Sequence, residues 1–299
     1  MSEDRAQGET QDGASVGSKV AGGVAGKVVG KVVVITGGAR GIGLATATAL
    51  HRLGAKVAIG DIDEVAVKES GADLGLKVYG KLDVTDPASF TDFLDQVERQ
   101  LGPIDVLVNN AGIMPVGRVI DEPNDLTRRI LDINVYGVIL GSKLAVQRMV
   151  PRGHGHVINM ASLAGELHLV GLATYVASKH AVLGFTDSAR LEYRSTGVRF
   201  SAVLPTFVNT ELVSGTQGMK GFRNAEPAEI ADAVVELVAA PKPRMRVTKA
   251  AGAAVVLLKF WPRWAVEGLN RLLGGEHVFT DEVDAEQRRD YETRARGQE

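Results

Sequence analysis

The feature that most constrains the fold is a regular alternation of short apolar runs with longer stretches of helical periodicity. Six such runs predict strands buried on both faces of a sheet, at residues 32–35, 56–59, 77–82, 104–108, 156–160 and 199–204. Helical patterns fill the intervals, including one long helix over residues 125–149. Because strands that alternate with helices are joined by right-handed crossovers, we expect an α/β fold with a doubly wound parallel sheet, helices on both faces and a single domain.

Composition excludes several classes of protein. The chain has 299 residues, a formal net charge of −2 and no cysteine. Such a chain lacks the basic footprint of a nucleic-acid-binding protein, and disulfides, thiol nucleophiles and cysteine-ligated zinc are excluded. No apolar run approaches the ~20 residues of a membrane-spanning helix, and the charged first residues do not resemble a signal peptide. We expect a cytoplasmic protein without a metal site, in which His154 and His156 lie in a solvated turn.

A glycine-rich turn, Thr36-Gly-Gly-Ala-Arg-Gly-Ile-Gly43, joins the first strand to its helix. Its glycines allow a diphosphate to approach a helix N-terminus, whose free N–H groups favour anions. The acidic residue expected about 20 residues further on is Asp61, at the end of the second strand. A carboxylate there binds ribose hydroxyls and repels a 2′-phosphate, and Ile62 supplies no cation, so we expect NAD rather than NADP. Arg40 is the neighbouring side chain that could still reach a phosphate.

The most chemically informative residues follow the fifth strand. Ser162 lies just after it, and Tyr175 and Lys179, four residues apart, project from one face of a predicted helix. Lowering the ordinary phenol pKa of ~10 by ~3 units needs ~4 kcal/mol, which an ammonium at ~4 Å supplies at an effective dielectric of about 20. We therefore expect Lys179 to bring the pKa of Tyr175 near neutrality, so that Tyr175 exchanges protons. The alternative is an ordinary Tyr and Lys on a helix surface.

These motifs together resemble the short-chain dehydrogenase/reductase family. The resemblance covers residues 28–245 and rests on the glycine-rich turn, on Asn109-Asn-Ala-Gly112, and on Ser162 thirteen residues before Tyr175-Val-Ala-Ser-Lys179. It implies a Rossmann-like fold. A hydrolase is disfavoured, because Ser162 lacks the Gly-x-Ser-x-Gly elbow.

The resemblance also implies roles for four catalytic residues. Tyr175 would be the acid/base, Ser162 would orient the substrate oxygen and stabilise charge on it, and Lys179 would bind the nicotinamide ribose and lower the pKa of Tyr175. Asn134, on the long helix, matches the family's fourth catalytic residue, which anchors a water in the proton relay.

The cofactor positions that the resemblance implies are Gly37, Arg40, Gly41, Ile42, Gly43, Asp61, Ile62, Asp83, Val84, Asn110, Ala111, Gly112, Tyr175, Lys179, Pro205, Val208 and Thr210. Asp83 and Val84 match the pair that recognises adenine, whereas Asn109 is expected to tie neighbouring strands together. One departure from the family is Thr206, which replaces the usual glycine after Pro205.

The substrate side is predicted to be apolar. Residues 211–224 match the family's substrate lid and include Leu212, Val213, Met219 and Phe222. We expect a lipophilic alcohol or ketone as substrate. Glu166 and His168 are expected to be ordinary loop residues.

The end of the chain departs from the family. Residues 250–273 are apolar and amphipathic, with Trp261, Trp264 and scattered basic residues. Such a segment can lie in a membrane interface, or it can cover the substrate cleft or an interface in a homodimer or homotetramer. The charged end beyond Asp281 is expected to be a solvated helix or tail.

The sequence thus predicts a flexible extension (1–27), a dinucleotide-binding catalytic domain (28–248) and an amphipathic helical extension with a tail (249–299). The expected function is an NAD-dependent oxidoreductase. One alternative is a dinucleotide-binding regulatory protein that catalyses nothing. Another is isomerase or dehydratase chemistry on the same scaffold.

Overall fold

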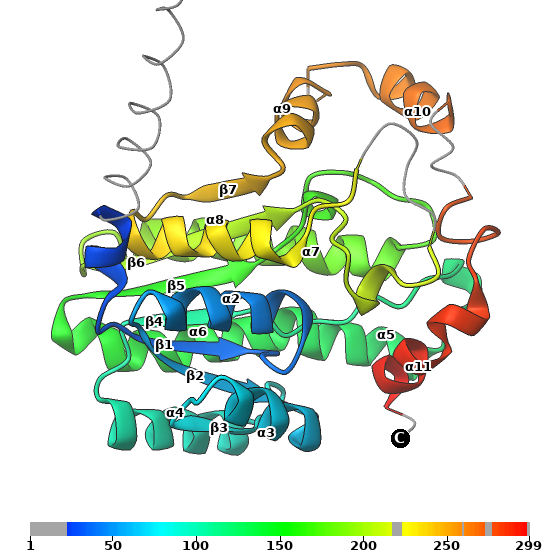
Figure 1. Ribbon diagram of the computed structural model, residues 1–299. Helices are drawn as coiled ribbons and strands as arrows, with labels where there is room; N and C mark the ends of the chain where they lie inside the picture. The colour runs from blue at the N-terminus through cyan, green and yellow to red at the C-terminus, as the bar shows by residue number, and fades with distance from the viewer. Residues whose placement is uncertain (1–22, 217–222, 259, 273–276, 298–299) are drawn as a thin grey trace, which may run out of the picture.

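A computed structural model describes residues 23–216, 223–258, 260–272 and 277–297 (Figure 1). Most of the predicted N-terminal extension, residues 1–22, lies outside the described residues, while residues 23–28 are helical and Val28 is buried. Met219 and Phe222 of the predicted lid also lie outside the described residues.

Seven parallel strands form the sheet: β1 (Val32–Thr36), β2 (Lys56–Asp61), β3 (Val78–Lys81), β4 (Val106–Asn109), β5 (Gly155–Met160), β6 (Val198–Pro205) and β7 (Arg244–Val247). Their order is β3-β2-β1-β4-β5-β6-β7, which confirms the predicted doubly wound, Rossmann-like topology. The direction of winding reverses between β1 and β4, and ligands of such sheets bind beyond the carboxyl ends of the strands at this switch point.

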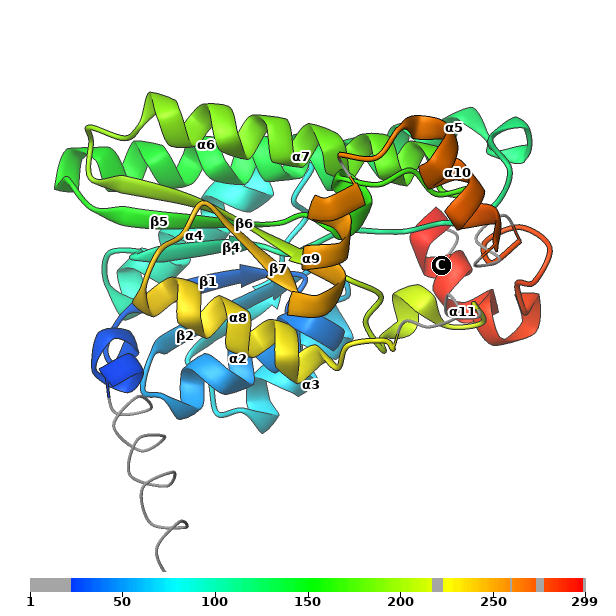
Figure 2. The same cartoon turned by 90° about the horizontal axis from the view of Figure 1, so that it is seen from above.

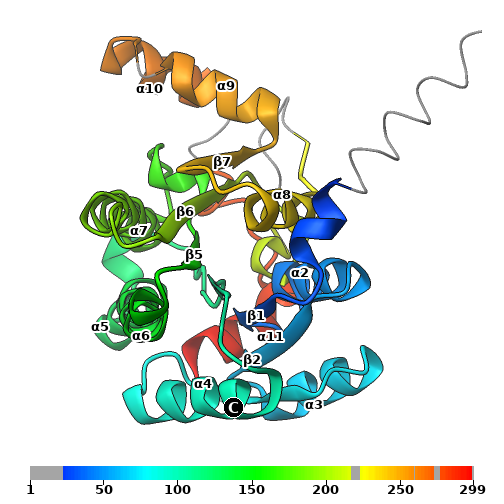
Figure 3. The ribbon, with the colours of Figure 1, turned by 90° about the vertical axis from the view of Figure 1, so that its left-hand side faces the viewer.

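The helices are α2 (Gly41–Arg52), α3 (Glu64–Asp73), α4 (Pro87–Leu101), α5 (Asn124–Leu131), α6 (Gly137–Met149), α7 (Ala173–Glu192), α8 (Pro227–Ala239), α9 (Lys249–Leu258), α10 (Arg263–Leu272) and α11 (Ala285–Arg296). Figure 3 shows α2, α3 and α8 on one face of the sheet and α4, α6 and α7 on the other. Strand β1 explains this layering, because its residues alternate between faces. Val33 and Ile35 pack in the core under α2 and α8, whereas Val32 and Val34 pack in the core under α4 and α6.

The predicted long helix contains a π-helical turn, Asp132–Tyr136, between α5 and α6. Such wider turns often occur at functional sites, and here the turn carries Asn134, which is fully buried. By length and composition alone, Asn124–Arg152 is apolar enough to cross a membrane, since an 18-residue stretch of it has a mean hydropathy of 1.2. The sequence analysis did not expect such a stretch. Its packing against β4 and β5 accounts for the apolar composition as that of a core helix.

The charged end of the chain is not a solvated tail. Figures 1 and 2 both place α11 beyond the carboxyl ends of the strands, where Arg288 and Tyr291 are buried. Val278 and Phe279, which precede α11, join an apolar cluster around Tyr175. The expectation of solvation is therefore wrong, because these side chains pack against segments far earlier in the chain, such as Met114 and Leu212.

The expectation of a solvated turn is also wrong for His156. It lies within β5, is buried, and has its Nε2 2.8 Å from the hydroxyl of Ser201. Burial lowers its pKa to about 3, so the ring is neutral. His154, before the strand, is exposed as expected.

Candidate active site

One cavity of about 1610 Å³ lies at the carboxyl ends of the strands. It runs from Gly37, Asp61 and Asp83 on one side to Ser162 and Tyr175 on the other. This volume exceeds the ~300–1,000 Å³ typical of a site for one drug-sized ligand. The cavity is large enough for a dinucleotide and a second molecule together.

The glycine-rich turn shapes one end of the cavity. Gly37 and Gly41 have φ angles of +65° and +54°, which side-chain-bearing residues rarely adopt. A Cβ on Gly43 would lie 2.0 Å from the carbonyl oxygen of Gly37, so Gly43 lets α2 pack against the turn and does not itself line the cavity. Arg40, at the N-cap of α2, makes no side-chain capping bond. The first N–H groups of α2 therefore suit an anion such as a diphosphate.

Asp61 lies where the sequence predicted a ribose-binding carboxylate. Its carboxylate accepts hydrogen bonds from the N–H groups of Ala39 (3.0 Å) and Asp63 (3.2 Å). Burial raises the pKa of Asp61 above its ordinary value, and these two hydrogen bonds oppose that rise. Arg40 is held by carboxylates, because its guanidinium lies 2.5 Å from Asp63 and 4.0 Å from Glu211. Neighbouring Ile62 is half exposed and lines the same end of the cavity.

The Asn-Asn-Ala-Gly stretch, which starts with the last residue of β4, divides into structural residues and residues that line the cavity. Asn109 is buried and donates to the side chain of Asn159 on β5 (2.9 Å), which ties the two strands together as predicted. Asn110 donates to the carbonyl oxygens of Thr36 (2.9 Å) and Gly37 (3.0 Å), so it braces the glycine-rich turn.

The other predicted cofactor positions lie around the same cavity. Its lining includes Ile42, Val84, Asn110, Ala111, Gly112, Pro205, Val208 and Thr210. Thr206, where the family has glycine, donates its N–H to Val247 on β7 (2.6 Å). Because Thr206 does not have a positive φ, the backbone at this position does not require glycine.

Ser162, Tyr175 and Lys179 meet in the middle of the cavity. Ser162 caps a short helical turn after β5, where its hydroxyl accepts a hydrogen bond from the N–H of Ala164 (3.1 Å). Tyr175 lies in the first turn of α7, and Lys179 follows one turn later. The Lys179 ammonium donates to the carbonyl oxygen of Met160 (3.0 Å) and lies 5.6 Å from the centre of the Tyr175 ring.

The predicted near-neutral pKa of Tyr175 is wrong. Burial raises the pKa of Tyr175 to about 12, although the neighbouring Ser162 hydroxyl opposes the rise. Burial also lowers the pKa of Lys179 to about 8. An effective dielectric of about 20, used for the prediction from sequence, describes a partly solvated pair. Both groups are instead almost fully buried, and desolvation disfavours the charged form of each. Tyr175 is therefore a protonated phenol near neutral pH.

Asn134 lies behind this group. Its side chain exchanges two hydrogen bonds with the backbone of Ile113, both 2.9 Å long, and donates to Ser178 (3.1 Å). Ser178 in turn donates to the carbonyl oxygen of Tyr175 (2.6 Å). Asn134 is thus brought close to the other three residues without lining the cavity. A Cβ on Gly112 would lie 3.2 Å from Asn134 and 3.6 Å from Lys179, so a larger residue here would be tight against Asn134.

The sequence analysis missed the role of Glu166. Its side chain is only 2 % exposed and pairs with Arg244 and Arg246 on β7. Glu166 follows the turn that carries Ser162, so the ion pairs attach that turn to the sheet edge. One sign of this role was present in the sequence: Arg244 and Arg246 form a basic pair with no acidic residue close to them in the chain.

The other end of the cavity is mostly apolar. Its wall includes Met114, Leu163, Leu167, Leu169, Phe207, Leu212, Val213, Val255, Leu258 and Trp261. Residues from α11 also line it, namely Tyr291, Arg294 and Ala295. The sequence analysis predicted the apolar lining but not the contribution from α11.

Comparison with known proteins agrees with this geometry. A sequence profile of the short chain dehydrogenases matches residues 31–220. A 3-alpha-(or 20-beta)-hydroxysteroid dehydrogenase of Mycobacterium tuberculosis is 38% identical over 210 residues, covering 68% of this chain and 80% of that protein. A cis-4-hydroxycyclohexanecarboxylate dehydrogenase of Sinomonas cyclohexanicum is 36% identical over 217 residues, covering 68% and 87% respectively.

A third relative is longer than this chain. The probable oxidoreductase EphD of Mycobacterium tuberculosis is 34% identical over 255 residues, which are 77% of this chain but only 43% of that protein. The chain therefore spans less than half the length of this relative.

Proposed function

Because the chain belongs to the short-chain dehydrogenase family, we propose that it is an NAD-dependent oxidoreductase that interconverts a lipophilic secondary alcohol and its ketone. The observation that carries the proposal is that Ser162, Tyr175 and Lys179 line the same cavity as Asp61 and the N-terminus of α2. A nicotinamide cofactor, when bound, supplies or accepts the hydride. The residues of the chain handle the proton and the positioning.

Each residue has a proposed part in that chemistry. The Ser162 hydroxyl holds the substrate oxygen beside Tyr175, which lines the same cavity. Tyr175, with a pKa of about 12 through burial, gives its proton to the ketone oxygen during reduction and takes it back during oxidation. Lys179 binds ribose hydroxyls and supplies positive charge to the phenolate. Asn134 holds the backbone of Ile113 and the first turn of α7 in place.

The surroundings of Asp61 support NAD over NADP. A 2′-phosphate would meet the Asp61 carboxylate, with Asp63 close by. Arg40, the cation that the sequence analysis considered as a phosphate ligand, is engaged by Asp63 and Glu211. Two negative groups so close together repel each other by several kcal/mol when they are desolvated.

The apolar end of the cavity supports the substrate class. Two relatives are named as dehydrogenases of a hydroxysteroid and of a hydroxycyclohexanecarboxylate, which favours an alcohol on a saturated ring. The apolar wall of the cavity suits such a molecule, with Ser162 and Tyr175 as its polar anchors.

The test is a screen of the purified protein with NADH and NADPH against steroid and simple cyclic ketones, followed by nicotinamide absorbance. We expect turnover with at least one apolar cyclic ketone, and a kcat/KM about tenfold or more higher with NADH than with NADPH. Binding of NADH without turnover across the panel would favour the regulatory alternative. Product formed without a change in the nicotinamide would favour an isomerase or dehydratase.

An exposed apolar patch on α9, on α10 and on the segment between them supports a further partner. Leu257, Phe260 and Trp264 are 65%, 84% and 76% exposed, and Figure 1 shows both helices beyond the edge strand β7. We expect a second copy of the chain to cover the patch in a homodimer or homotetramer. Alternatively, the patch binds a membrane surface, and the protein is then cytoplasmic and membrane-peripheral. Light scattering and sedimentation with anionic lipid vesicles separate these two outcomes.

A further inference from the structure

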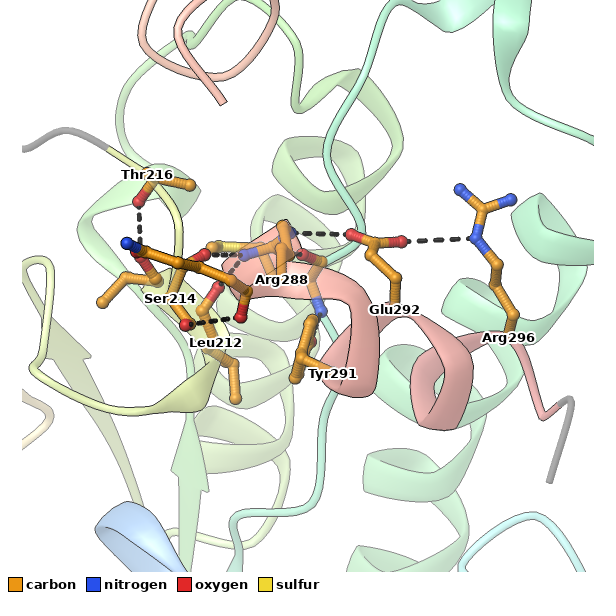
Figure 4. Close-up of polar contacts among 10 residues, drawn as sticks. Leu212, Ser214, Thr216, Arg288, Tyr291, Glu292 and Arg296 are labelled. Atoms are coloured by element: carbon orange, nitrogen blue, oxygen red, sulfur yellow. Dashed lines mark hydrogen bonds and ion pairs between the residues drawn. The ribbon is translucent and has the colours of Figure 1, made fainter. Parts of the chain in front are cut away.

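Arg288 on α11 is the largest fully buried side chain in the described part of the protein. Burying a guanidinium is unfavourable unless its donors are satisfied. Arg288 donates to the carbonyl oxygens of Met114, Leu212 (2.7 Å) and Ser214 (3.1 Å), and to the carboxylate of Glu292 (2.7 Å). Figure 4 shows this side chain at the centre of the network.

The three carbonyls belong to two separate loops. Met114 lies in the loop after β4, a few residues beyond Gly112, whereas Leu212 and Ser214 lie in the loop after β6, just beyond Thr210. Met114 and Leu212 both line the apolar end of the cavity. The Arg288 side chain therefore links two parts of the cavity wall that follow different strands of the sheet.

Tyr291, one turn after Arg288, makes the second half of the connection. Its hydroxyl accepts a hydrogen bond from the N–H of Met114 (2.6 Å), and its ring lies 4.7 Å from the Arg288 guanidinium carbon. Arg288 and Tyr291 thus satisfy both backbone polar groups of Met114. Tyr291 also lines the cavity.

Further contacts fix the rest of α11 along the loop after β6. The N–H of Asp284 donates to the carbonyl oxygen of Gly215 (2.8 Å), the Ser214 hydroxyl donates to that of Gln287 (3.1 Å), and Arg294 pairs with Glu211 (2.5 Å). Glu211 is also the carboxylate that lies 4.0 Å from Arg40 at the cofactor end. The contacts of α11 thus extend from the substrate end of the cavity toward the cofactor end.

We propose that Arg288 is a positioning residue that fixes the separation of the loops after β4 and β6, and so sets the shape of the site for the apolar part of the alcohol or ketone. This inference rests on the proposed function. Arg288 does not line the cavity, so it acts through Met114, Leu212 and Tyr291. Its loss loosens the substrate wall and leaves Ser162, Tyr175 and Lys179 in place.

The experiment compares Arg288→Met with Arg289→Met. Arg289 is the next residue of α11 and is exposed, so the control removes the same charge without removing the network. For Arg288→Met we expect KM for the ketone to rise about 10- to 100-fold, as for the loss of one to two charged hydrogen bonds, with kcat changed less than about threefold. Arg289→Met should change neither constant. Arg288→Lys keeps the charge but not the planar fork of donors, and should give an intermediate KM.

Hydrogen exchange provides a readout that needs no turnover. In Arg288→Met, amides of residues 206–216 should exchange faster, while those of β1 and β4 should not change. Unchanged exchange and unchanged KM would overturn the proposal. So would a parallel fall of kcat, NADH affinity and melting temperature in both Arg288 variants, which would mean general unfolding. If the wild-type protein showed no turnover but residues 206–216 still loosened, the proposed function would fail while the positioning role remained.

Discussion

Replacing Lys179 with Met should make the protein more stable near neutral pH while removing its activity. Burial lowers the pKa of Lys179 from 10.5 to about 8. Protonating it at pH 7 therefore costs about 3 kcal/mol more in the folded protein than in the unfolded chain. Methionine carries no charge and has a similar length, so the variant avoids this cost. Buried charges kept at such a cost are typical of sites where function and stability conflict.

The net gain is smaller, because Lys179 also makes a useful contact. Its ammonium donates to the carbonyl oxygen of Met160, and leaving that oxygen unpaired costs about 1–3 kcal/mol. We therefore expect Lys179→Met to be more stable than the wild type by about 1 kcal/mol at pH 7, a rise of roughly 2 °C in Tm. Activity should fall by about 100-fold or more.

The pH dependence of the stability difference distinguishes removal of the buried charge from improved packing as its cause. The unfolded chain binds the Lys179 proton more tightly than the folded protein does, so the penalty is present in full below the folded pKa of about 8 and disappears as pH rises to 10.5. The stability of the wild type relative to Lys179→Met should therefore improve across that interval, by about 3 kcal/mol in total.

Urea unfolding at several pH values between neutrality and the unfolded pKa of Lys179 measures the effect. Lys143→Met is the matched control, since Lys143 is exposed on α6, and its difference from the wild type should not vary with pH. A Lys179 variant less stable than the wild type at pH 7, or one whose difference stays constant with pH, would refute the reasoning.

Three further predictions follow from the site. Asp61→Ala should weaken NADH binding about 10- to 100-fold and reduce the preference for NADH over NADPH. Fluorescence titration with both cofactors measures this, and an unchanged preference would show that Asp61 does not select the cofactor. Glu166→Ala should lower the free energy of unfolding by about 2–4 kcal/mol, because Arg246 loses its buried partner and Arg244 keeps only Asp187 among the described residues. A loss below about 1 kcal/mol in urea titrations would contradict this. Gly43→Ala should lower the free energy of unfolding by more than about 2 kcal/mol, since its Cβ would overlap the Gly37 carbonyl; thermal melts without and with NADH would detect it.

The sequence predicted what depends on local pattern. Strand and helix positions follow from the alternation of buried and exposed residues, and strand ends locate the glycine-rich turn, Asp61 and Ser162 on one edge of the sheet. Those positions need no knowledge of distant contacts, because parallel topology alone brings the ends of β1, β2 and β5 together.

What could not be predicted depends on contacts between distant segments and on burial. Arg288 and Met114 are 174 positions apart, and a charged helix gives no local sign that one of its arginines is buried. In the π-helical turn at Asn134, hydrogen bonds join residues five apart instead of four, a difference that the pattern of apolar residues does not reveal. The pKa of Tyr175 was misjudged because desolvation is a property of the packed site, not of the spacing between Tyr175 and Lys179.

The central claim is that Tyr175 transfers the proton to or from the substrate oxygen. The most direct measurement compares Tyr175→Phe with Tyr193→Phe, a phenol at the far end of α7 that stacks on Phe200, in steady-state turnover and in NADH binding. The account predicts that Tyr175→Phe loses about 100-fold or more of kcat and binds NADH within about threefold of the wild type, while Tyr193→Phe keeps both. Turnover by Tyr175→Phe close to the wild-type rate would contradict the account.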